Sequence, residues 1–292
     1  MDCGEGSRQP EEQRRAVRRG TGGYGSRLLS CRVQLESYVY PPYGTPLVEA
    51  YGAGFESVFI VLHPFVRVPE PLAWSVTRQY PDDAQIHARG SRCSWAEVAA
   101  QAGMTSCARV NQALLTSIGS LTDYLADPSG RDALQTLVQT QPVWLPAEGR
   151  FEPLLQASFL EAFAMAGHEQ LVFVPEFPQS DPVERLAIAA LRSGAVPFPF
   201  CGTLMAPDES FLFTVDWDSF FTLFYGPRAF VANAARTLAL EGFFATPNTD
   251  HAWFNYTMGC ATVTVSPEDW PNVEAPALAR GLERMKDLSQ SR

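Results

Sequence analysis

The stretch FLFTVDWDSFFTLFYG, residues 211–226, places two carboxylates, Asp216 and Asp218, inside a run of aromatic and aliphatic residues. If a strand covers 211–217, the alternation of side chains sets both acids on one face of the sheet. Asp218 and Ser219 are also favoured N-cap residues, so a short helix can instead begin directly after the strand. In the first interpretation the acids form a functional pair. In the second, Asp218 caps a helix and Asp216 is hydrogen-bonded at the end of the sheet.

The composition indicates a globular protein. The 292 residues are 46% hydrophobic and 12% aromatic, enough to bury a sizeable core in one large domain or two small ones. Charged residues make up 18% of the chain, below the usual share of about a quarter. The net charge of -10 argues against nucleic acid or an anionic membrane as a partner of the folded part. Lys286 is the only lysine, and this preference for arginine suggests a GC-rich, bacterial genome.

The charge is unevenly distributed along the chain. Residues 1–27 contain six arginines and four acids, a net charge of +2, which leaves -12 for residues 28–292. This arginine-rich head has almost no apolar residues, so we expect it to be disordered. The segment GTGGYGSR that follows its arginines lacks the apolar stretch of an export signal. The six cysteines form no C-x-x-C pair and no window is apolar enough to span a membrane, so we expect a cytoplasmic protein.

Apolar periodicity and turn residues predict a mixture of strands and helices. The expected strands cover 31–40, 55–66, 169–177, 211–217 and 260–265. The expected helices fall within 94–137 and over 153–167, 180–194 and 227–241, with short ones starting at Ser266 and Ala277. Residues 67–92, rich in Pro, Asp and Arg, are typical of a long irregular loop.

Two of the expected helices have clear start signals. Ser94 is a good N-cap, and Glu97 three residues on completes a capping box. Pro182, after an acidic or hydroxyl cap residue, suits the first position of the helix over 180–194.

The order of these elements predicts an α+β fold. Strands and helices follow one another without a regular βαβ alternation, so we expect helices packed on a mixed sheet. We expect one domain over residues 28–292, with a helical insertion at 94–165.

No motif for nucleophilic or phosphate chemistry is present in the sequence. G-x-S-x-G and H-E-x-x-H are absent, and the glycines of GTGGYG follow no strand and precede no helix. We therefore assign no residue to cofactor binding, and whether a cofactor or a metal binds is left open.

Three further residues are candidates to work with the acidic pair. His63 closes a buried strand, where sheet ends commonly present side chains to a cleft, although a structural histidine beside a proline is the plainer interpretation. Asp250 and His251 lie in NTDHAWF, which can also be a turn bonded to its own backbone. If Asp216 and Asp218 face a cleft, these groups would suit metal-assisted hydrolysis or acid–base catalysis on a small polar substrate.

A binding function is the leading hypothesis. Fourteen aromatic residues lie between 198 and 254, which favours an aromatic pocket or a protein interface beside an ordinary core. Together with the charge of -12 over residues 28–292, they indicate an interaction protein whose acidic surface neutralises a basic protein partner. The small-molecule enzyme is the alternative, and the oligomeric state is left open.

Four short blocks carry a family resemblance. They are VFIVLHPFV (58–66), SW (94–95) followed by ALLTSIGSL (113–121), DWDSFFTLFYG (216–226) and LEGFFA (240–245). They resemble the bacterial domain-of-unknown-function 2711 family over most of residues 55–254. The block around DWDSFFT is also similar in style to immunity proteins of bacterial toxin systems. Neither resemblance implies a catalytic residue.

Overall fold

The computed structural model describes residues 38–42, 45–51, 54–68, 80–178, 180–250, 254–257 and 260–263. The arginine-rich head, most of the strand expected over 31–40 and the helices expected at Ser266 and Ala277 lie outside these residues. Residues 38–40, the described end of that expected strand, form no strand.

A seven-stranded sheet forms the centre of the described protein, in the order β10-β1-β9-β8-β7-β5-β6. All its neighbouring strands are antiparallel, where the sequence led us to expect a mixed sheet. Its strands are β1 (Ser57–Leu62), β5 (Gln170–Val174), β6 (Glu184–Ala187), β7 (Gly202–Met205), β8 (Leu212–Val215), β9 (Phe221–Gly226) and β10 (Gly242–Phe244). In a smaller sheet, β2 (Phe65–Arg67) lies between β3 (Ser91–Cys93) and β4 (Val143–Trp144), and β11 (Phe254–Thr257) pairs with β12 (Cys260–Val263).

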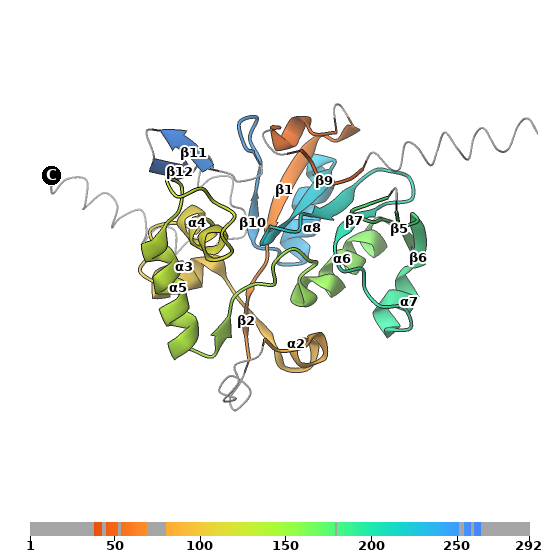
Figure 1. Cartoon of the computed structure of the whole chain (residues 1–292). Helices are drawn as coiled ribbons and strands as arrows, with labels where there is room; N and C mark the ends of the chain where they lie inside the picture. Colours follow the sequence, from red (N-terminus) through yellow and green to blue (C-terminus); the bar gives the residue numbers. More distant parts are fainter. Residues whose placement is uncertain are drawn as a thin grey trace, which may run out of the picture.

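Helices cover both faces of the central sheet, which gives three layers (Figure 1). One face carries α3 (Trp95–Gln101), α4 (Cys107–Ser117) and α5 (Pro128–Thr140). The other carries α6 (Pro153–Met165), α7 (Ile188–Ser193) and α8 (Arg228–Thr237). The helix α2 (Asp83–Arg89) and the 3-10 helix η2 (Leu47–Glu49) lie outside these layers. The α+β class predicted from the sequence is confirmed. None of the helices in the described ranges has both the length and the apolar character needed to cross a bilayer.

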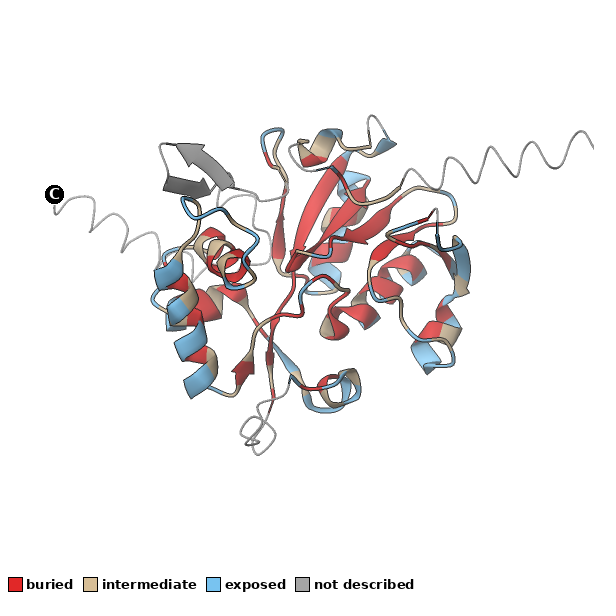
Figure 2. Ribbon diagram, in the orientation of Figure 1, coloured by how far each residue is buried: buried red, intermediate tan, exposed pale blue. Residues whose placement is uncertain are grey.

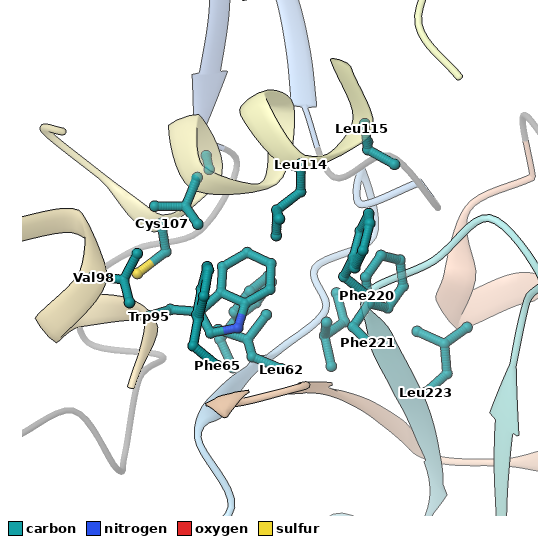
Figure 3. Packing of buried hydrophobic residues seen from close by; sticks show 14 of the residues in the cluster. Leu62, Phe65, Trp95, Val98, Cys107, Leu114, Leu115, Phe220, Phe221 and Leu223 are labelled. Atoms are coloured by element: carbon teal, nitrogen blue, oxygen red, sulfur yellow. The ribbon is translucent and has the colours of Figure 1, made fainter. Parts of the chain in front are cut away.

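Burial on both faces explains the uninterrupted apolar run of β1. All six of its residues are buried (Figure 2). Ile60 packs in the cluster formed with α3, α4 and α5, whereas its neighbour Phe59 packs in the cluster formed with α6 and α8. In the first cluster the Trp95 indole lies against Phe65 beneath α4 (Figure 3). The indole N–H donates to the His63 carbonyl at 2.6 Å, so the polar edge of this buried ring is satisfied.

Two helix predictions are wrong, because strand pairing with distant segments overrides the local signals. Within 180–194, residues Glu184–Ala187 pair with β5 as β6, and the helix α7 starts only at Ile188. It does end at Gly194, in the left-handed conformation (φ 72°). The helix considered after Asp218 is absent, because Phe221–Gly226 is β9, paired on both sides with β1 and β8.

Other expectations are partly right. Ser94 caps α3 as expected, since its side chain accepts from Glu97 N–H, but the Glu97 carboxylate bonds Arg67 instead of closing the capping box. The expected loop 67–92 contains α2, which begins with its own capping box between Asp82 and Gln85.

Candidate functional site

One end of the central sheet gathers segments that are distant in sequence. The strands β1, β5 and β8 end there and β7 and β9 begin there, as the pairs Leu62 with Phe221 and Gly202 with Val215 show. The loop before α6 crosses the same end, where Gly149 N–H donates to the Ser219 carbonyl and Phe151 N–H to that of Phe200, both at 2.9 Å. Antiparallel geometry therefore brings five loops into one surface.

Six residues of these loops form what we call the rim. It consists of three exposed aromatic residues and three carboxylates: Phe177, Phe200, Trp217, Glu148, Glu176 and Asp218. The aromatic residues are 59%, 59% and 61% exposed, in the order named. Most other large aromatic residues of the described protein are buried or partly buried. The three exposed rings on neighbouring loops therefore do not serve as core residues, and an exposed apolar group of this kind indicates an interaction site.

The acidic pair Asp216 and Asp218 lies at this rim, but not on one strand face. The strand β8 ends at Val215, and residues 216–220 form a turn in which the Asp216 carbonyl accepts from the N–H and the hydroxyl of Ser219. Asp216 is buried, Trp217 points to solvent and Asp218 is partly exposed. The turn thus displays the tryptophan that strand alternation would have placed opposite the two acids.

The charges of the rim act on one another. Burial raises the pKa of the Glu148 carboxyl, and the neighbouring charge of Asp218 raises it further. In the loop directly before β7, the Cys201 Sγ donates to Glu176 Oε2 at 3.4 Å. Burial, together with the charges of Glu176 and Asp216, raises the pKa of this thiol to about 12. The rim is therefore an acidic environment in which the thiol stays protonated.

Close packing fixes the position of the Trp217 turn. Gly149 has φ 65°, and a Cβ on it would lie 2.0 Å from the Trp217 carbonyl oxygen. On the inner side, Phe220 and Phe221 point into the core beside Leu115 (Figure 3). The backbone that carries the exposed Trp217 indole is therefore held in place by close packing on both sides.

His63 lies behind the rim, fully buried. Its Nε2 is 2.8 Å from Thr222 Oγ1 and its Nδ1 is 3.4 Å from the Ala147 carbonyl. These contacts fit a neutral ring that donates from Nδ1 and accepts at Nε2. Burial lowers the pKa of His63 to about 3. The ring is therefore a neutral, hydrogen-bonded part of the core.

The other candidates are not brought to this surface. Asp250 follows Thr249, whose carbonyl accepts from Leu47 N–H. Leu47 in turn accepts from the hydroxyl of Tyr225, near the opposite end of β9 from the rim. His251 lies outside the described residues. The structure joins Asp216 and Asp218 in one turn and sets Asp250 at the far end of the sheet. A catalytic role for these residues stays a prediction.

Two acids with a raised pKa, Glu152 and Glu241, were not predicted from the sequence. Glu152 is fully buried at the start of α6 and accepts from the N–H groups of Ala147 (3.0 Å) and Leu154 (3.5 Å). Burial raises the pKa of Glu152, and that of Glu241 at the edge of the sheet, to about 7. Glu152 directly before Pro153 is a helix-start signal that could have been noticed, whereas nothing in the sequence marks Glu241.

Among the residues that the structure describes, no group of three or more His, Cys, Asp and Glu side chains is arranged to hold a metal ion.

The comparisons with known proteins identify the family. The model of the family described as "Protein of unknown function (DUF2711)" matches residues 43–255, so the chain belongs to this family, as the sequence blocks predicted. The chain is similar to "Uncharacterized protein YwbB" of Bacillus subtilis (strain 168), with 22% identity over 226 residues. That alignment covers 74% of this chain and 98% of the relative. No solved structure matches the chain.

Proposed function

We propose that the protein is a binding protein whose rim holds a basic segment of a protein partner. The observation that carries this proposal is the exposure of Phe177, Phe200 and Trp217 on loops that also carry Glu148, Glu176 and Asp218. Exposed aromatic surface next to charged groups is typical of an interaction site.

The chemistry of the rim selects for arginine or lysine. A guanidinium can stack on an aromatic face while its N–H groups reach a carboxylate, and such stacking contributes about 0.5–2 kcal/mol for each ring. The protein itself contains one example, since Arg150 Cζ lies 4.8 Å from the centre of the Phe200 ring while Arg150 bonds Asp83. The charge of -12 over residues 28–292 would also speed the approach of a basic partner. An immunity-like protein, which neutralises a basic toxin, is one form that this function can take.

Binding of a basic peptide tests the proposal. The probe is a capped Arg-Arg-Ala-Val-Arg-Arg peptide, with its glutamate counterpart as the opposite charge, and the affinity is measured by calorimetry at low and high salt. We expect binding of the basic peptide alone, weakened by salt. Trp217→Ala and its control are made in a chain whose Arg14, Arg15, Arg18 and Arg19 are replaced by Gln, so that these arginines do not compete with the peptide. In this chain Trp217→Ala should weaken binding about tenfold, which corresponds to the loss of one well-placed ring.

Tyr124→Ala is the matched control, because Tyr124 is 74% exposed but lies in the connection between α4 and α5, which contributes no residue to the rim. This variant should bind like the chain in which it is made. Equal weakening by Trp217→Ala and Tyr124→Ala would show that the peptide binds without using the rim.

A further inference from the structure

We propose that in the free protein the rim is occupied by the chain's own arginine-rich head, through the segment Arg14–Arg19, which a basic partner must displace. The inference rests on the proposed function, because it assigns the first ligand of the same surface.

The arginine-rich head contains the side chains that the rim is proposed to bind. The segment RRAVRR has four arginines in six residues around one alanine and one valine. Residues 1–27 have a net charge of +2 against -12 for the rest of the chain. Arg150 already stacks on Phe200, so the rings of Phe177 and Trp217 are the ones open to the head. Four guanidinium groups spaced around two small apolar side chains complement these two rings and the three carboxylates of the rim. Charge and side-chain type therefore both match.

The chain is long enough to bring the head to the rim. Tyr38, near the start of the described residues, donates to Glu209 Oε2 at 3.1 Å, in the hairpin between β7 and β8. That hairpin lies at the opposite end of the sheet from the rim. The strands between the two ends are four to six residues long, a span of roughly 13–20 Å. From Arg19 to Tyr38 the chain reaches up to about 60 Å when extended, so the path around the sheet is easily covered.

Tethering makes even a weak contact effective. A segment joined to its site by a linker of this kind acts at an effective concentration on the order of 1 mM. If the free segment binds the rim with a Kd of about 0.1 mM, the tethered head fills it roughly nine-tenths of the time and weakens a competing ligand about tenfold. The head would then set a threshold that only a strongly basic partner passes.

The test compares two variants of the full chain with the wild type, using the same capped Arg-Arg-Ala-Val-Arg-Arg peptide. In the head variant, Arg14, Arg15, Arg18 and Arg19 are each replaced by Gln. The matched control replaces four surface arginines of the described body by Gln: Arg131, Arg185, Arg192 and Arg236. Both variants lose the same charge, so a general electrostatic effect changes them equally.

We expect the head variant to bind the peptide about tenfold more tightly than the wild type, and the control variant to differ from the wild type by less than twofold. Equal affinity of the head variant and the wild type would overturn the inference and leave the rim as a binding site. Absence of binding by all three proteins would overturn the proposed function together with the inference. A wild-type dimer that becomes monomeric in the head variant would overturn docking within one chain, because the head would then occupy the rim of a second copy.

Discussion

The carboxylate of Glu241 accepts a hydrogen bond at 2.9 Å from the backbone N–H of Trp95, 146 residues earlier in the chain. Its other oxygen accepts from Ala96 N–H at 3.2 Å, so a residue at the edge of the sheet caps the first turn of α3 together with Ser94. The Glu241 backbone carbonyl also accepts from Leu62 N–H of β1. One residue thus joins the helical layer to the sheet.

Replacement of Glu241 by Ala should lower the free energy of unfolding by about 1–3 kcal/mol, because two partly buried N–H groups in the first turn of α3 lose their acceptor. Urea unfolding followed by circular dichroism measures this change. Glu184→Ala, on the exposed face of β6, should stay within about 0.5 kcal/mol of the wild type. A cost for Glu241→Ala no larger than that of the control would show that α3 is held without this cap.

Stability should fall as the pH rises from about 4.5 to about 7, and Glu152 should be one cause. Burial raises the pKa of Glu152 from 4.5 to about 7. The folded protein therefore keeps a proton that the unfolded chain has lost, so the contribution is complete below pH 4.5 and is lost as the pH passes 7. Its size is on the order of 2–3 kcal/mol. Glu152→Gln should flatten this part of the curve, measured by urea unfolding at pH 4.5, 6 and 7.5, and an unchanged slope in this variant would contradict the role of Glu152.

Replacement of Gly149 by Ala should destabilise the rim by more than the cost of placing alanine in a left-handed conformation. The new Cβ would meet the Trp217 carbonyl at 2.0 Å, whereas a Cβ at Gly167, which has a similar φ of 80°, meets nothing within 4 Å. Gly167→Ala should therefore cost about 1–2 kcal/mol for the left-handed conformation alone, and Gly149→Ala several kcal/mol or a displaced turn. Thermal unfolding and peptide binding of the two variants distinguish these outcomes. Equal melting temperatures and equal peptide affinities would contradict the close approach of position 149 to the Trp217 carbonyl.

Limited proteolysis tests the domain organisation expected from the sequence. Trypsin should first remove the arginine-rich head and leave a stable product that begins near residue 28, as mass spectrometry would show. The structure gives a reason for one unit, because α3, α4 and α5 share a core with β1 and β9 of the central sheet. Early cleavage within 94–165, followed by survival of that fragment, would instead establish a separate domain.

The sequence predicted the elements whose signals are local. The apolar run of β1, the cap at Ser94 and the glycine that ends α7 at Gly194 all act through residues a few positions apart. The helix prediction for 180–194 was wrong because its helix signals compete with strand pairing to β5, and no local sequence pattern reveals that partner. The same reason explains β9, whose two neighbours are β1 and β8.

The candidate site was only partly predictable. The acids Asp216 and Asp218 were found because charges stand out in an apolar run, and both lie in the loop that carries Trp217. Their arrangement was not predictable, since it depends on β8 ending at Val215, one residue before the first acid. The rim as a whole also needs Phe177 and Phe200, which reach it through the order of strands in the sheet.

That strand order has a consequence for synthesis. The strand β1 ends at Leu62, yet both of its partners, β9 and β10, lie between residues 221 and 244. At about 5–20 residues per second, a ribosome needs roughly ten to thirty seconds to make the intervening chain. Throughout that interval the β1 segment, which is apolar on both faces, has no strand to pair with. A stalled chain that ends near residue 210 should therefore bind a chaperone at β1, whereas a chain extended well past residue 244 should not. A strand that is buried on both faces is thus made early and is paired on both edges only after residue 244 has been translated.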